Sequence, residues 1–131
     1  MKKIILSSIA ILFLCSLMVH AADFKKTKIA VASSGKTENA SVSNRATRCP
    51  YYLIFDEKGE LIELVDNPYA DASGGAGPSA ANFLAKTGVT MAIAGNFGPK
   101  MANALKNNGI TPFRFEGSVG DAVKTGLEGR Q

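Results

Sequence analysis

The chain has 131 residues and a formal net charge of +4 at pH 7, and two of its lysines lie in the first 21 residues. Without that segment, thirteen basic residues face eleven acidic ones, which leaves a net charge of +2. So weak a charge gives no support to a nucleic-acid partner, and a chain of about 110 residues suits a single domain.

Residues 1–21 have the pattern of a cleavable secretory signal. Two lysines precede an apolar run from Ile4 to Val19, and the small residue Ala21 marks the expected cleavage point. An uncleaved anchor is the alternative, but a spanning helix usually needs ~20 apolar residues without such an exit. We therefore expect a periplasmic or secreted domain of residues 22–131, with no membrane partner after cleavage.

Cleavage would also remove His20 and Cys15, so the mature chain would hold no histidine and a single thiol, Cys49. That thiol cannot form an intramolecular disulfide. In an oxidising compartment it is expected to be buried, paired between chains, or a ligand.

The remaining residues predict five strands and three helices. Short apolar runs bounded by turn residues indicate strands at Ile29–Ala32, Tyr51–Phe55, Leu61–Val65, Met91–Ala94 and Pro112–Phe115. Proline starts and glycine stops indicate helices from Pro78 to Gly88 and from Pro99 to Gly109. Ser118 and Asp121 predict the capped start of a last helix that runs through Leu127.

These elements predict an α/β fold with a ribonuclease-H-like topology. Only the second half of the chain offers crossover helices, which parallel neighbouring strands require. The economical arrangement is a mixed five-stranded sheet in the order 3-2-1-4-5, with helices on its faces and the second strand antiparallel to the others.

In this topology the loops that follow several strands meet at one edge of the sheet. Ligands of open α/β sheets bind where the strand order reverses, and three helix amino termini are expected to point there and to favour an anion. The predicted binding residues are Ser33, Ser34, Arg45, Arg48, Gly74, Gly75, Gly77, Asn96, Gly98 and Lys100.

The glycine run and Cys49 each have two interpretations. The run Gly74–Gly77 could cradle an anion, because glycine lets the backbone approach a ligand closely, or it could be a linker before a helix. Cys49 lies beside cations that would lower its pKa, which predicts a soft metal ligand. A small buried hydrophobic residue is the equal alternative for this cysteine.

The chain also resembles the dinitrogenase iron-molybdenum cofactor biosynthesis family. The resemblance lies in Arg48–Ile54, in Gly74–Gly77 and in the block Ala92–Lys100, and it covers nearly the whole mature chain. It implies the same ribonuclease-H-like fold and a non-enzymatic role in holding an anionic metal-sulfur species, such as an iron-molybdenum or molybdenum-copper sulfide cluster. The chain has Ala46 and Thr47 where many relatives carry Phe-Gly, often after a histidine.

We therefore expect an exported binding or carrier protein for a molybdenum- or iron-containing sulfide or oxyanion. One thiol per chain cannot wrap a cluster, so a homo-oligomer, or ligation mainly by hydrogen bonds, would be needed. Two other classes remain: a small hydrolase or transferase that uses the same edge, against which the missing histidine argues, and an interaction module without a ligand.

Overall fold

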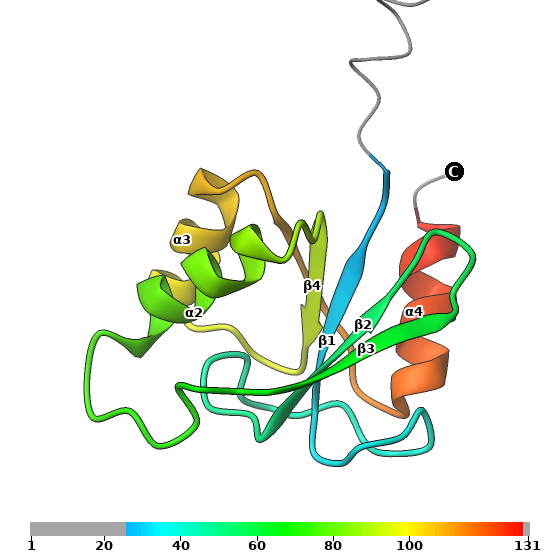
Figure 1. Ribbon diagram of the computed structural model, residues 1–131, viewed down its shortest axis with the longest axis horizontal. Coiled ribbons are helices and arrows are strands. Elements are labelled where there is room, and N and C mark those ends of the chain that lie inside the picture. Colours follow the sequence, from blue (N-terminus) through cyan, green and yellow to red (C-terminus); the bar gives the residue numbers. More distant parts are fainter. Residues whose placement is uncertain (1–25, 130–131) are drawn as a thin grey trace, which may run out of the picture.

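The computed structural model describes residues 26–129 (Figure 1). Its elements are β1 (Ile29–Ser33), β2 (Tyr51–Phe55), β3 (Leu61–Asp66), α2 (Ala76–Lys86), β4 (Met91–Ala94), α3 (Pro99–Asn107), β5 (Thr111–Arg114) and α4 (Val119–Glu128). The expected signal segment, residues 1–21, lies outside the described residues. Within 26–129, no helix has both the length and the apolar character needed to cross a membrane.

The five strands form one mixed sheet in the order β3-β2-β1-β4-β5. β2 is antiparallel to both β1 and β3, whereas β4 is parallel to β1 and β5. The predicted strand order and the antiparallel second strand are confirmed. Antiparallel neighbours need no crossover helix, whether the connection is long, as in residues 34–50 between β1 and β2, or short, as in residues 56–60 between β2 and β3. Helices α2 and α3 provide the crossovers that the parallel pairs require.

The sheet is covered on both faces. Helices α2 and α3 pack on one face and α4 packs on the other (Figure 1). Along β1, Ala30 and Ala32 belong to the core under α2 and α3, whereas Ile29 and Val31 belong to the core under α4. Every residue of β1 is therefore buried, as expected for a central strand.

The start of α2 differs from the sequence prediction by two residues. The helix begins at Ala76 rather than Pro78, because Gly75 adopts a left-handed conformation with φ of 65° and forms the N-cap. Pro78 is then the third helical residue, where a missing N–H is tolerated because the first four N–H groups have no intrahelical acceptor. The glycine run thus leads directly into the helix, and Gly77 belongs to α2.

Candidate anion-binding site

Two adjoining cavities lie where the loop after β4 meets the loop before β2. The larger cavity, about 450 Å³, lies between the starts of α2 and α3 and is lined by Thr47, Arg48, Gly74, Gly75, Ala76, Gly77, Pro78, Phe97, Gly98, Pro99, Lys100 and Met101. The smaller, about 210 Å³, is lined by Asn44, Arg45, Ala46, Thr47, Arg48, Asn96, Phe97 and Gly98. Because four lining residues are common to both, the two cavities share a wall.

Most of the predicted site residues meet in these cavities. Lys100 and the three predicted glycines of the 74–77 run line the larger one, Arg45 and Asn96 line the smaller one, and Arg48 and Gly98 line both. None of the residues lining either cavity is acidic. The cavities therefore carry positive charge from three side chains without a carboxylate beside them.

Ser33 and Ser34 line neither cavity. Ser33 is fully buried, and its hydroxyl donates to the carbonyl of Gly35 at 2.7 Å. The hydroxyl of Ser34 donates to the carbonyl of Ser41 at 3.0 Å. Both serines thus fold the loop that follows β1, and the structure does not bring them to the predicted site.

The starts of α2 and α3 face the larger cavity with free backbone donors. Neither N-cap, Gly75 or Gly98, supplies a side-chain cap. The first N–H groups of a helix have no intrahelical partner, so the amides of Ala76, Gly77 and Lys100 remain available. Together with the helix dipoles, which carry about +0.5 charge at each start, they favour a negatively charged ligand.

Gly77 also sets the distance between these two helices. A Cβ atom on Gly77 would lie 3.3 Å from the backbone nitrogen of Met101 in α3. A side chain at this position would therefore press α3 away from α2. The glycine that was predicted to contact the ligand also keeps both helix starts at the same cavity.

The third helix, α4, does not contribute to the site, and its predicted role there is wrong. Its first amides are already hydrogen-bonded: Val119 N donates to Ala40 O at 2.9 Å, and Gly120 N donates to Glu38 O at 3.0 Å. The hydroxyl of Ser118 accepts from the amide of Asp121 at 3.2 Å, as the capping pattern predicted. The loop after β1 folds over the start of α4 and satisfies its donors.

Backbone contacts hold the loop of residues 43–48 against the end of β4. Ser43 N donates to Ala32 O, and Gly95 N donates to Ser43 O, both at 2.8 Å. Ala46 N donates to Asn96 O at 3.1 Å. These bonds link β1, the 43–48 loop and the loop after β4, so the position of Arg45 and Arg48 is fixed by the central strands.

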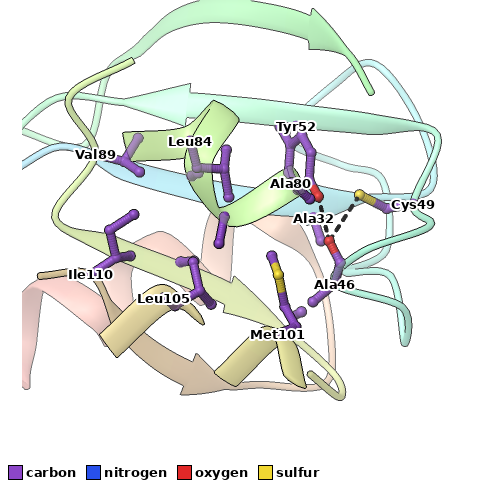
Figure 2. Close-up of a cluster of buried hydrophobic side chains, with 14 of the residues drawn as sticks. Ala32, Ala46, Cys49, Tyr52, Ala80, Leu84, Val89, Met101, Leu105 and Ile110 are labelled. Atoms are coloured by element: carbon purple, nitrogen blue, oxygen red, sulfur yellow. Dashed lines mark hydrogen bonds between the residues drawn. The ribbon is translucent and has the colours of Figure 1, made fainter. Parts of the chain in front are cut away.

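A buried polar cluster supports the same loop on its core side (Figure 2). Cys49 and Tyr52 both point toward the carbonyl oxygen of Ala46 and donate to it, the thiol at 3.7 Å. The side-chain amide nitrogen of Asn67, Nδ2, donates to Thr47 O at 2.7 Å and to Cys49 O at 2.8 Å. Side-chain donors thus satisfy the backbone carbonyls of Ala46, Thr47 and Cys49.

The prediction of a lowered pKa for Cys49 is wrong. Its side chain is fully buried, and burial raises the pKa of the thiol to about 11, although hydrogen bonds from Tyr52 and Asn67 act in the opposite direction. Burial likewise raises the pKa of Tyr52 far above its ordinary value. The sequence neighbour Arg48 is not among the groups that lower the pKa of this thiol, and its guanidinium donates to the carbonyl of Ala72.

Direct coordination of a metal has little support from this arrangement. No group of three or more His, Cys, Asp or Glu side chains that could hold a metal ion exists among the described residues. The assignment of Cys49 as a metal ligand stays a prediction, and its thiol faces the core rather than either cavity. Charge and backbone hydrogen bonds are what the cavities offer.

Three polar or aromatic wall residues were not among the predicted site residues. Thr47 and Phe97 line both cavities, and Asn44 lines the smaller one. Phe97 lies inside the block Ala92–Lys100 that carries the family resemblance, so the signal was present. In the sequence alone, neither a threonine beside an arginine nor a lone phenylalanine indicates a ligand site. Their role becomes visible only when the positions of the loops in the fold are known.

The family model for the dinitrogenase iron-molybdenum cofactor matches residues 26–129. The chain belongs to this family. No curated protein matches it at a significant level. The family match covers both cavities, all five strands and the three described helices.

Two solved structures share more than a third of their aligned residues with this family member. A candidate NifB protein from Thermotoga has 36% identity and a TM-score of 0.67, covering 79% of this chain and 90% of that one. The apo form of the orange protein from Desulfovibrio gigas has 34% identity and a TM-score of 0.74, covering 79% and 89%. A candidate dinitrogenase from Methanococcus jannaschii, at 20% identity and a TM-score of 0.57, covers 82% and 92% and supports the fold alone.

Proposed function

We propose that this protein binds and carries an anionic metal-sulfur species or oxyanion that contains molybdenum or iron. The observation that carries the proposal is the larger cavity, where two uncapped helix starts, Arg48 and Lys100 meet without an acidic residue. Family membership supports the class of cargo, because the family is that of the dinitrogenase iron-molybdenum cofactor.

The cargo would be held by hydrogen bonds and charge. An anion in the larger cavity could accept from the amides of Ala76, Gly77 and Lys100, since these donors have no intrahelical acceptor. The guanidinium of Arg48 and the ammonium of Lys100 would neutralise further charge. The glycines in the wall have no side chains, which leaves room for sulfur atoms, and these are larger and softer than oxygen.

We propose a binding role rather than catalysis. General acid-base chemistry is carried most often by a histidine or a carboxylate near the reacting atoms. The chain has one histidine, His20, which lies outside the described residues, and no carboxylate lines either cavity. A cluster carrier also differs from a colourless hydrolase in having visible charge-transfer bands when it is isolated.

The carrier would work in the periplasm or outside the cell. The basic start, the apolar run from Ile4 to Val19 and the small residue Ala21 support removal of residues 1–21. A mass spectrum of the protein recovered from the periplasm tests this step, because cleavage predicts a mature chain that begins at Ala22.

Metal retention tests the cargo. The purified protein is loaded with tetrathiomolybdate and copper, passed through a desalting column, and assayed for molybdenum and for visible absorbance. We expect retention by the unmodified protein and a loss of about tenfold or more in Lys100→Glu, because that change puts a negative charge in place of a cation that lines the cavity.

The matched control is Lys124→Glu, the same change on an exposed site of α4. This variant should retain molybdenum as well as the unmodified protein does. No retention by the unmodified protein, or an equal loss in both variants, would contradict the proposal.

A further inference from the structure

The outer edge of β3 has no neighbour in the described sheet. β3 pairs with β2 on one side only, so the backbone N–H and C=O groups on its other side have no ladder partner. Free strand edges are templates on which another extended chain can pair. Natural proteins usually protect such edges.

The opposite edge of the sheet is protected. β5 has only four residues, and Pro112 in its middle has no N–H to donate. Proline and short length are both ordinary means of keeping a strand edge unpaired. β3 has six residues and no proline, so this edge lacks both of the protections that β5 has.

β3 also carries the exposed large hydrophobic side chains of the described residues. Leu61, Ile62 and Leu64 are 38%, 51% and 44% exposed. Leu64 lies opposite Leu53 and Leu61 lies opposite Phe55, and both partners belong to the core under α4. Leu61 and Leu64 therefore continue that core face outward, beyond the area that α4 covers.

The other face of the same strand carries an acidic residue, Glu63. Glu63 lies opposite Ile54, which belongs to the core under α2 and α3, so its carboxylate is on the face away from Leu64. Glu60 precedes the strand and Asp66 ends it, and residues 60–66 contain no lysine or arginine. Two copies paired antiparallel through β3 would bring acidic residues together, which is unfavourable.

The geometry points to β3 as a docking edge for an extended segment of another protein in which aliphatic residues alternate with lysine or arginine. The aliphatic side chains would cover Leu61 and Leu64, and the basic ones would face Glu63. β3 is followed directly by Asn67, whose amide supports the loop that lines both cavities. If the proposed carrier role holds, an acceptor docked on β3 would contact the strand that leads directly into the support of the cavity wall.

The test uses the purified protein without cargo and a short acetylated peptide of alternating valine and lysine, with an alternating valine-glutamate peptide as the control. Backbone amide shifts and hydrogen exchange are followed by NMR. We expect shifts and slowed exchange at Leu61–Asp66 with the basic peptide only. Glu63→Lys should weaken binding by about tenfold, because one attractive cross-strand pair becomes repulsive.

Glu128→Lys, the same charge change on the exposed end of α4, should leave peptide binding unchanged. Leu64→Thr keeps strand propensity and removes apolar contact, so it should weaken binding as well. Equal binding of both peptides, no protection of β3 at millimolar peptide, or self-association through β3 would overturn the inference. Because no cargo is present, these outcomes are independent of metal retention.

Discussion

At the scale of single residues, burial rather than sequence neighbourhood decides what a side chain can do. Cys49 stands next to Arg48 in the sequence, yet its thiol lies in the core beneath the loop and donates to Ala46 O. The guanidinium of Arg48 reaches Ala72 instead. Two adjacent residues thus serve opposite sides of the same loop.

Thiol chemistry tests this account of Cys49. With a pKa of about 11 and no exposed surface, the thiol should react with an aromatic disulfide reagent at neutral pH only after unfolding. Absorbance of the released thiolate, with and without denaturant, measures it. Cys49→Ser should retain molybdenum like the unmodified protein; loss of molybdenum in this variant would support the cysteine as a ligand.

At the scale of elements, loops tied to the central strands build the site. The pattern of apolar runs, prolines and glycines was sufficient to predict the helices that start at the cavity. It could not predict that residues 38–40 would take the amides at the start of α4, because this loop has no periodicity and its backbone contacts depend on the finished fold. For the same reason, the sequence could not show that Ser33 and Ser34 line neither cavity.

Gly95 provides a test of how closely the 43–48 loop packs on β4. A Cβ at this position would lie 2.4 Å from Asn44 Oδ1 and 3.0 Å from Asn44 Cα. Gly95→Ala should therefore destabilise the protein by about 1–3 kcal/mol, the usual cost of overpacking. Urea unfolding followed by circular dichroism measures this difference.

Gly74→Ala is the matched control, because a Cβ there meets no atom within 4 Å and its φ is not positive. It should change the free energy of unfolding by less than about 0.5 kcal/mol. Equal effects of the two substitutions would show that the close approach of Gly95 to Asn44 does not constrain the loop.

At the scale of the whole molecule, the fold was predictable and the site only in part. Strand order followed from the positions of the crossover helices, which the sequence marks clearly. Assembly of Arg45, Arg48, Asn96 and Lys100 followed from the same topology. The contribution of Phe97 and the buried position of Cys49 depend on side-chain packing, which strand order does not determine.

Because of the buried cluster, the free energy of unfolding should decrease at alkaline pH. Folding raises the pKa of Cys49 from 9.0 to about 11, so the protonated thiol is favoured in the folded state. Its contribution is complete below about pH 9 and is lost as the pH rises to about 11. The loss is on the order of 2–3 kcal/mol, and Tyr52 shifts in the same direction.

Urea unfolding of the unmodified protein and of Cys49→Ser, at several pH values across this range, separates the contribution of the Cys49 thiol from that of the Tyr52 hydroxyl. The stability difference between the proteins should change between about pH 9 and about pH 11, because serine does not titrate there. A difference that stays constant over this interval would contradict burial of the thiol.

The central claim, that the starts of α2 and α3 form an anion site, is tested most directly by NMR titration of the protein with tetrathiomolybdate. The largest amide shifts are predicted at Gly75–Gly77 and at Gly98–Met101, with little change at Val119 and Gly120, whose amides are already bonded. Shifts centred on the start of α4, or shifts spread evenly over the surface, would contradict it.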